Sequence, residues 1–365
     1  MDPKNFVEKI KENFFSPFMG VPCSVFTSLL NYIDESKDTE NYICSSEGEA
    51  MGLAGGFALS GKYPVVYMQN DGYGNAVNPL SSLQLLYDLP ALLLISWRGL
   101  PGKKDAPQHM LMGETILELL ETFKIPYRIL DEGEEDLENA VKEASSYCKK
   151  NRRPYTLIIK KGYFSKYERV KTDDRNILSL RMEYLDELKL HLKKDDVLLG
   201  TTGFTGRELY QSFDHPGKFY MTGSMGCLAS LGLGVSIENK EKRVFLLDGD
   251  GAVLMKLGSL ATIGHYSPDN LIHVCFDNSA YESTGSQPTV SANTDLCKVA
   301  DGCGYKYSAV VESIGQFKIL LENIDKKNKP AFIRIIISPG TIEGLERPGD
   351  TPVQMRNKFE KFLDR

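Results

Sequence analysis

Short apolar runs alternate with amphipathic stretches along the whole chain. The runs in the first half lie at residues 63–68, 90–97 and 153–160. The runs in the second half lie at residues 196–200, 243–248, 270–277 and 330–338. Each run has the length of a buried strand, and the stretches between them have the periodicity of helices. Strands that alternate with helices predict an α/β fold in which helices cover parallel sheets.

A polar, charged passage interrupts this alternation near the middle of the chain. From Phe164 to about Asn176 there is no apolar periodicity, which predicts a linker. The 365 residues also exceed the size at which a single core usually stops growing. We therefore expect two doubly wound parallel-sheet domains, residues 1–165 and 181–365, joined by residues 166–180, with no middle domain.

Composition and charge limit the classes of partner. Hydrophobic residues make up 42% and charged residues 25% of the chain, as in globular proteins. The net charge of −6 disfavours a broad surface for nucleic acid or anionic membranes, so a few placed cations must hold any anionic ligand. The N-terminus does not have the pattern of a signal peptide, and no later run is long enough to span a membrane. Seven scattered cysteines without a CxxC pair indicate reduced thiols, and we expect a cytoplasmic protein.

The most informative segment, residues 244–285, has the pattern of a strand, a tight turn, a helix, a second strand and a second turn. The first turn holds Gly249, Asp250 and Gly251, and the second holds Asn278. Right-handed crossovers bring both turns to one edge of a parallel sheet. Asp250 and Asn278 are therefore expected to share a ligand.

The residue types in these turns suit a metal-bound diphosphate. Two glycines allow close approach of the backbone, and the helix that begins near Ala252 offers free amides to phosphate oxygens. The Asp250 carboxylate, the Asn278 amide oxygen and the backbone carbonyl of Ala280 are hard ligands of the kind that Mg²⁺ prefers. A Gly-Asp-Gly sequence alone is also an ordinary turn, so the metal interpretation depends on the spacing to Asn278.

This spacing resembles the thiamine diphosphate-dependent decarboxylase superfamily, and the resemblance implies thiamine diphosphate and Mg²⁺ as cofactors. In related enzymes a buried glutamate activates the cofactor and precedes a small-residue helix that ends in Gly-aromatic-Ala. Gly56-Phe57-Ala58 matches that ending and selects Glu47 rather than Glu49. Without the resemblance, both acids would be interpreted as residues that favour a helix N-terminus.

The resemblance extends to further residues that would hold the cofactor. Met225, beside Ser224 in a run of small residues, matches the residue that separates the two cofactor rings, although methionine also commonly fills core gaps. The expected cofactor-binding residues are Gly249, Gly251, Ala252, Thr202, Gly203, Thr205, Ser224 and Met225. Because the two domains that hold the cofactor come from different subunits in this superfamily, a homodimer or homotetramer with active sites at the subunit interface is implied.

Two loops of the first domain are expected to select the substrate, because ligands bind at the carboxyl ends of the strands in such sheets. The loop after residue 97 contains Arg98, Lys103, Lys104 and His109, an unusual density of basic residues in an acidic protein. It predicts a pocket for an anionic group, and His109 could deliver a proton to the product. The alternative is a solvated loop with a few surface cations. The expected substrate-binding residues are Arg98, Lys103, Lys104, Asn70, Gln108 and Tyr281.

The segments SEGEA, GNAVNPL, MTGSMGC and LDGDGAVLM resemble phosphonopyruvate decarboxylases, and sulfopyruvate decarboxylases share much of the pattern. The implied reaction is non-oxidative decarboxylation of 3-phosphonopyruvate to phosphonoacetaldehyde and CO₂ in phosphonate biosynthesis. The alternatives are 3-sulfopyruvate or another small anionic 2-oxo acid as substrate, a carboligase, or a non-catalytic subunit. Two departures bear on the substrate. Asp71 stands where a small residue is expected, and Tyr281-Glu282 stand where His-Asp is expected.

Overall fold

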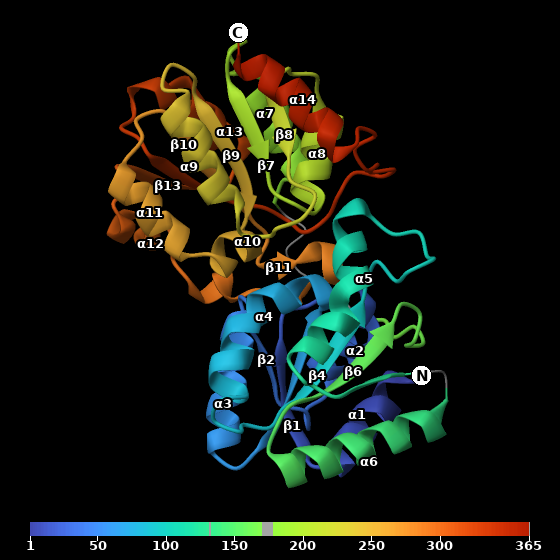
Figure 1. Ribbon diagram of the computed structural model, residues 1–365. Coiled ribbons are helices and arrows are strands. Elements are labelled where there is room, and N and C mark those ends of the chain that lie inside the picture. The colour runs from blue at the N-terminus through green and yellow to red at the C-terminus, as the bar shows by residue number, and fades with distance from the viewer. Residues whose placement is uncertain (131–132, 170–177, 365) are drawn as a thin grey trace. The chain divides into compact units, whose positions relative to one another are not determined.

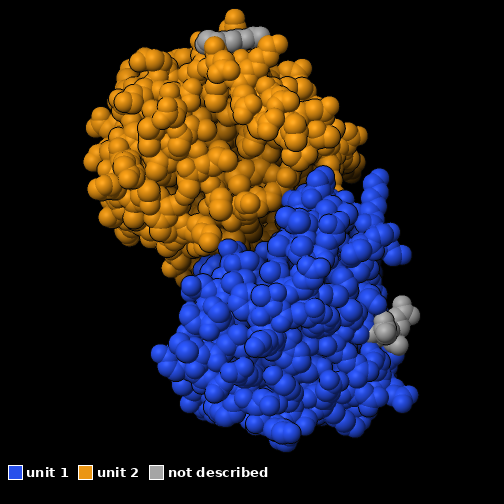
Figure 2. Space-filling view, in the orientation of Figure 1, with its two compact units in different colours: residues 1–171 blue, residues 172–365 orange. Residues whose placement is uncertain are grey.

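The computed structural model describes residues 1–130, 133–169 and 178–364. The chain forms two compact units, residues 1–171 and residues 172–365 (Figure 2). Most of the predicted linker falls on residues 170–177, which lie outside the described residues.

Unit 1 is a six-stranded sheet with the order β2-β1-β3-β4-β6-β5, and its strand pairs are parallel (Figure 1). Its strands are β1 (Phe15–Gly20), β2 (Asn41–Ile43), β3 (Tyr63–Gln69), β4 (Leu92–Trp97), β5 (Tyr127–Ile129) and β6 (Tyr155–Lys160). Its α-helices are α1 (Pro3–Glu12), α2 (Thr27–Glu35), α3 (Glu47–Leu59), α4 (Tyr73–Pro79), α5 (Pro107–Thr122) and α6 (Glu134–Asn151). Three short helical turns complete it: η1 (Ser24–Phe26), η2 (Asn70–Gly72) and η3 (Leu80–Gln84).

Unit 2 has the same plan, a parallel six-stranded sheet with the order β13-β14-β10-β9-β7-β8. Its strands are β7 (Val197–Gly200), β8 (Lys218–Tyr220), β9 (Val244–Gly249), β10 (Leu271–Asp277), β13 (Tyr307–Val311) and β14 (Ala331–Ile336), with a small antiparallel pair, β11 (Ala280–Tyr281) and β12 (Gln287–Pro288). Its α-helices are α7 (Arg181–Leu190), α8 (Phe204–Ser212), α9 (Leu228–Glu238), α10 (Asp250–Met255), α11 (Gly258–Tyr266), α12 (Leu296–Cys303), α13 (Ile314–Glu322) and α14 (Pro352–Leu363). The turns are η4 (Glu282–Thr284), η5 (Val290–Asn293) and η6 (Ile324–Lys326).

The apolar runs form strands because each sheet is buried on both faces. Along β3, Val65 packs in the core layer under α1, α2 and α6, while Val66 packs in the layer under α3, α4 and α5. In unit 2, Phe245 of β9 faces α7, α8 and α13, and its neighbour Leu246 faces α9, α11 and α12. Successive side chains of a strand point to opposite faces, so both must be apolar when helices cover both faces.

The predicted α/β fold class with two parallel sheets is confirmed, and each predicted apolar run forms a strand. The strands that the pattern did not single out include β2, β5, β8 and β13, which lie at the sheet edges. Three of them have only three residues, and β13 is largely half-buried, so they lack long apolar runs. No described helix is both long and apolar enough to cross a membrane.

Each sheet has a point at which the connections from two neighbouring strands lead in opposite directions. In unit 1 this point lies between β1 and β3, and in unit 2 between β7 and β9. Ligands in open α/β sheets bind beyond the carboxyl ends of the strands at such a point. A ligand site is therefore expected at the segments that follow β2, β3 and β4 in unit 1, or β7, β9 and β10 in unit 2.

Candidate active site

Glu47 lies at the first turn of α3, directly after β2, and only 5% of its surface is exposed. Its carboxylate accepts a hydrogen bond of 2.8 Å from the amide of Asn75. Gly72 lies against it, since a Cβ at position 72 would come within 2.1 Å of the Glu47 Oε1 atom. A buried carboxylate thus occupies a close-fitting niche between α3 and the turn after β3.

Glu49, the alternative acid, has a different environment. It is exposed, and its carboxylate accepts hydrogen bonds from the backbone amide and the hydroxyl of Ser45, at 2.8 and 2.6 Å. The Ser46 hydroxyl in turn accepts from the Glu49 backbone amide at 3.2 Å. Glu49 therefore stabilises the start of α3 in the manner of a helix cap.

The turn after β3 ties two loops together. Asn70 is fully buried, and its side chain donates to the Arg98 carbonyl at 2.8 Å and accepts from the Arg98 amide at 3.0 Å. Asn70 therefore fixes the loop after β4 rather than presenting a free amide. The next residue, Asp71, lies 2.7 Å from the Nδ1 atom of His109, which is buried in the first turn of α5.

Of the basic residues predicted to bind an anion, Arg98 is paired with a carboxylate, whereas Lys103 and Lys104 are exposed. The Arg98 guanidinium binds the Asp105 carboxylate through its Nε and Nη2 atoms, at 2.7 and 2.5 Å, and its Nη1 atom donates to Ser24 at 3.2 Å. Its hydrogen bonds to Asp105 hold the pKa of that carboxyl well below the ordinary value. Lys103 and Lys104 are exposed on the same loop. The two lysines, rather than Arg98, thus carry the accessible positive charge.

In unit 2, the register of the sheet brings the two predicted metal-binding turns together. Gly249 at the end of β9 pairs with Phe276 near the end of β10. Asp250 and Asp277 are the next residues of the two segments, so they begin side by side. The Ser291 hydroxyl lies 3.1 Å from the Asp250 carboxylate and 2.8 Å from the Asp277 carboxylate. The Thr289 hydroxyl also donates to Asp250.

The two carboxylates differ in how their charge is balanced. Arg334 binds Asp277 through its Nε and Nη2 atoms, at 2.7 and 2.6 Å. Asp250 is 2% exposed and, in the described part of the chain, has hydroxyl donors but no ion pair with a basic side chain. Burial, and then the nearby Asp277 charge, raise the pKa of Asp250. A divalent cation bound to Asp250 would supply the missing positive charge.

Asn278 and Ala280 complete the predicted metal-binding set, and both are buried. The Asn278 amide nitrogen donates to Glu282 at 3.0 Å, and its oxygen accepts from the Ala280 amide at 3.1 Å. The described residues contain no cluster of three or more His, Cys, Asp or Glu side chains with the arrangement of a metal site. The predicted magnesium ligands are one carboxylate, one side-chain amide and one backbone carbonyl. They include only one side chain of those four types, so they would not form such a cluster.

Glu282, one of the two departures, belongs to a buried ionic group. Its carboxylate accepts from Arg181 at 2.9 Å as well as from Asn278, and Arg181 also binds the fully buried Glu208 at 2.7 Å. Burial raises the pKa of Glu208, and the Arg181 charge opposes that rise. Glu282 thus links Asn278 to the core of unit 2.

The other predicted cofactor-binding residues lie around these turns. Gly251 packs tightly, since a Cβ there would meet the Tyr281 ring at 2.7 Å and the Met225 methyl group at 3.3 Å. After β7, the Thr202 hydroxyl donates to the Thr222 carbonyl at 3.0 Å, and Gly203 has a φ of +86°. Thr205 and Ala252 are buried, Gly249 is half-buried, and Ser224 is exposed.

Several polar residues next to the predicted site were not assigned a role from the sequence. They are Asn75, Asp277, Thr289, Ser291, Arg334, Arg181 and Glu208. Asn75 lies within the GNAVNPL segment, and Thr289 and Ser291 lie just beyond the second predicted turn, so a signal was present for these three. Arg334 and Arg181 approach through tertiary packing, and nothing in their local sequence indicates it.

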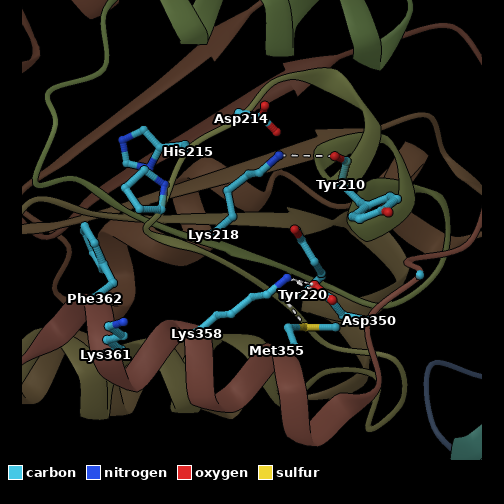
Figure 3. A pocket seen from close by; sticks show the side chains of 12 residues that line it. Tyr210, Asp214, His215, Lys218, Tyr220, Asp350, Met355, Lys358, Lys361 and Phe362 are labelled. Carbon is cyan, nitrogen blue, oxygen red and sulfur yellow. Dashed lines mark hydrogen bonds and ion pairs between the residues drawn. The ribbon is translucent and has the colours of Figure 1, made fainter.

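A hollow of about 610 Å³ lies elsewhere in unit 2, between α8, β8 and α14 (Figure 3). None of the predicted site residues lines it. Its buried Lys218 donates to the carbonyls of Leu209, Tyr210 and Phe213 at the end of α8, and burial lowers the pKa of Lys218 to about 8. Lys218 therefore satisfies the last carbonyls of a helix, which explains its burial without a ligand.

Comparisons with known proteins identify the family of the chain. Residues 200–335 match the family described as "Thiamine pyrophosphate enzyme, C-terminal TPP binding domain". A phosphonopyruvate decarboxylase of Streptomyces viridochromogenes is 34% identical, over 94% of this chain and 90% of that protein. A second, from Streptomyces hygroscopicus, is 33% identical over 94% and 89%. A sulfopyruvate decarboxylase of Methanosarcina acetivorans is 29% identical over 98% and 96%. The chain therefore belongs to the family of thiamine diphosphate-dependent decarboxylases, a group of carboxy-lyases, that includes phosphonopyruvate decarboxylases.

Proposed function

We propose that this enzyme decarboxylates 3-phosphonopyruvate to phosphonoacetaldehyde and CO₂, as a step of phosphonate biosynthesis in the cytoplasm. The observation that carries the choice of substrate is similarity along nearly the whole chain to two proteins named phosphonopyruvate decarboxylase. The seven free cysteines are consistent with a reducing compartment. Thiamine diphosphate, when bound, supplies the electron sink for loss of CO₂.

The described residues fit this cofactor and its metal. Asp250 is a buried carboxylate whose charge lacks a basic partner among the described residues, as expected of a ligand that binds Mg²⁺. The Asn278 amide oxygen and the Ala280 carbonyl would be the other protein ligands, and Glu282 would hold the Asn278 amide in place. Residues 202–205, 224–225, 249 and 251–252 would surround the diphosphate and thiazolium portions.

Glu47 is the proposed activating acid. Its burial against Gly72 and its hydrogen bond from Asn75 would fix a carboxyl group in one position, where it can exchange a proton with a bound heterocycle. Glu49 is exposed and its carboxylate is engaged with Ser45, which makes it the poorer candidate. His109 would deliver the proton that replaces CO₂ on the product.

The phosphonate group is proposed to bind the loop that follows β4. Lys103 and Lys104 would supply the positive charge, because Asp105 already neutralises most of the Arg98 guanidinium. Gln108 would contribute its amide, and Tyr281 is also proposed to contact the substrate. Asn70 would act through the Arg98 backbone, which its side chain holds.

A homodimer or homotetramer, with each active site at a subunit interface, is part of the proposal. Helix α3 supports an oligomer, because it has apolar residues both on the side that packs against unit 1 and on the side exposed to solvent. Leu53 is 36% and Leu59 is 71% exposed, and a Cβ placed at Gly52 or Gly56 would meet nothing within 4 Å apart from the adjoining backbone of the helix itself. Beyond its acidic first turn α3 is apolar on all sides, and such a helix is usually buried, so a partner subunit is expected to cover this face.

A comparison of substrates tests the proposal against its nearest rival. 3-Sulfopyruvate is that rival, because a sulfopyruvate decarboxylase aligns with the chain from end to end. Initial rates of CO₂ release should be measured with 3-phosphonopyruvate, 3-sulfopyruvate and pyruvate, with thiamine diphosphate and Mg²⁺ present. We expect 3-phosphonopyruvate to be fastest and the Glu47→Gln variant to be inactive on all three. Faster turnover of 3-sulfopyruvate would reassign the substrate while leaving the reaction class intact.

A further inference from the structure

Asp71 is an acid in a region proposed to bind an anionic substrate, where a small residue was expected, and it lies beside His109. The Asp71 carboxylate is 2.7 Å from the His109 Nδ1 atom. The histidine side chain is 10% exposed and the aspartate side chain 27% exposed, so water screens the pair only in part. An acid in this place cannot favour a second negative charge nearby, and its histidine partner suggests another role.

The backbone around His109 is held in place by close packing. A Cβ on Gly99 would meet the His109 carbonyl oxygen at 2.0 Å, and a Cβ on Gly113 would meet the Gly99 carbonyl oxygen at 2.0 Å. The Trp97 indole donates to the Gly113 carbonyl at 2.8 Å. Helix α5 is thus fixed against the loop after β4, and the remaining freedom of His109 is the orientation and protonation pattern of its ring.

Both polar neighbours of the ring favour the same protonation pattern. An ionised carboxylate can only accept, so the Nδ1 atom that faces Asp71 carries a proton. The amide nitrogen of Gln108 lies 3.5 Å from Nε2 and can only donate, which suits an unprotonated Nε2 in the neutral ring. A hydrogen bond at one ring nitrogen determines which form of histidine the other nitrogen presents.

Asp71 also belongs to the turn that contacts Glu47. In η2, Asn70 holds the Arg98 backbone, Asp71 holds His109, and Gly72 lies against the Glu47 carboxylate. Three consecutive residues therefore place an acid, a histidine and a loop relative to one another. This arrangement would keep the two proton-transferring groups of unit 1 in a fixed relation.

We propose that Asp71 is a positioning residue that holds His109 with a proton on Nδ1, so that Nε2 is the nitrogen that exchanges protons with the substrate. The proposal rests on the proposed decarboxylase function. The proton donor is the imidazolium form of His109, which carries a proton on both nitrogens. When it delivers its Nε2 proton, the N–H electron pair stays on Nε2, a C–H bond forms on the product, and the ring becomes the neutral form that keeps its Nδ1 proton hydrogen-bonded to Asp71. A proton taken up from solvent at Nε2 then restores the imidazolium.

The spectroscopic test uses protein labelled with ¹⁵N in its five histidines, without substrate, at a pH where the rings are neutral. The His109 signals are identified by their loss in His109→Gln. We expect the unprotonated nitrogen of His109 to be Nε2 in the wild type. In Asp71→Ala we expect a shift toward protonated Nε2, which imidazole prefers in water. A wild-type ring protonated on Nε2, or an unchanged spectrum in Asp71→Ala, would overturn the proposal.

Kinetics supply the second readout. Asp71→Ala should lower kcat by roughly ten- to hundredfold, the range expected for loss of a charged hydrogen bond, and leave KM nearly unchanged. Asp71→Asn keeps a carbonyl oxygen near the ring, so it should retain the Nδ1 proton and recover part of kcat. An Asp71→Asn variant as impaired as Asp71→Ala, or an unchanged kcat in Asp71→Ala, would contradict the proposal.

Glu187→Gln is the matched control, because Glu187 pairs with His191 at 2.9 Å on helix α7, in the other unit. It removes a carboxylate beside a histidine that has no proposed role. The His191 signals should change, while the His109 signals and kcat should not. If no anionic 2-oxo acid is decarboxylated, the proposed function fails, whereas the spectra of the free protein still decide whether Asp71 sets the form of His109.

Discussion

Replacing Asp250 by asparagine should stabilise the cofactor-free protein while it removes binding of the metal. The structure places the Asp250 carboxylate in a buried position beside Asp277, whose own charge Arg334 already balances. In the absence of a cation, the ionised Asp250 is therefore a cost to the folded state. Asparagine has nearly the same shape and no charge.

The size of this effect follows from the raised pKa of Asp250, caused by burial and then by Asp277. Each unit of such a rise corresponds to about 1.4 kcal/mol at a pH above the raised pKa. A rise of two or three units, of the order seen for buried carboxyls, gives about 3 to 4 kcal/mol. The asparagine amide brings N–H hydrogens into the same buried place, and an N–H that finds no partner costs about 1 to 3 kcal/mol. We therefore expect a net gain of between about 0 and 3 kcal/mol.

The gain should depend on pH in a defined direction. The folded protein binds the Asp250 proton more tightly than the unfolded chain, whose ordinary pKa is 3.8, so wild-type stability falls as pH rises from about 4 through the raised pKa. Above that pKa the folded protein carries the full destabilisation caused by the ionised Asp250 carboxylate. The advantage of Asp250→Asn should accordingly be full at pH 8 and smaller at pH 5.

Urea denaturation in the presence of EDTA, followed by circular dichroism, measures this difference. Asp301→Asn is the matched control, because Asp301 is exposed on helix α12, and its stability should stay within about 0.5 kcal/mol of the wild type. An Asp250→Asn variant that is less stable than the wild type at pH 8 would refute the reasoning. An equal gain at both pH values would refute it as well.

Addition of the cofactors should remove most or all of the stability advantage of Asp250→Asn. Ligands at about a hundred times their dissociation constant stabilise a folded protein by about 2.7 kcal/mol. The wild type should gain this amount from Mg²⁺ and thiamine diphosphate together, and Asp250→Asn should gain much less. Undiminished stabilisation of the variant would mean that Asp250 does not bind the metal.

The other predictions concern the proposed activating acid, the substrate loop and the buried ionic group. Glu47→Gln should keep the fold and cofactor binding, measured by calorimetric titration, but lose nearly all turnover. Glu49→Gln should remain active and lose about 1 kcal/mol of stability through its weakened helix cap. Loss of turnover in Glu49→Gln but not in Glu47→Gln would mean that Glu49 is the activating acid. Replacing Lys103 and Lys104 together by alanine should raise KM for the anionic substrate more than it lowers kcat in steady-state assays. Arg181→Met should destabilise the protein by about 3 to 5 kcal/mol in urea denaturation, because two buried carboxylates lose their cation, and a loss under 1 kcal/mol would contradict this.

The sequence by itself determined the fold class and the turns that follow the strands. Apolar runs such as residues 63–68 and 270–277 specify buried strands, because both faces of each sheet must be apolar. The Gly-Asp-Gly turn and Asn278, at the ends of β9 and β10, follow from the order of strand, helix and strand, since the right-handed crossover leaves little choice. These features are local, or depend on rules that hold for all parallel sheets.

Only the tertiary structure decided how the charges near these turns are balanced. The Arg98 guanidinium binds Asp105, and the Asp71 carboxylate lies beside His109, and the sequence predicted neither pair. Likewise, Glu282 lies with Arg181, a residue far away in the sequence. The Asp71–His109 and Glu282–Arg181 pairs join segments that are far apart in the sequence, and the low polarity of buried sites makes each partner matter energetically. The sequence therefore specified where polar groups emerge from the sheets, and the packing of the folded chain specified which of them neutralise one another.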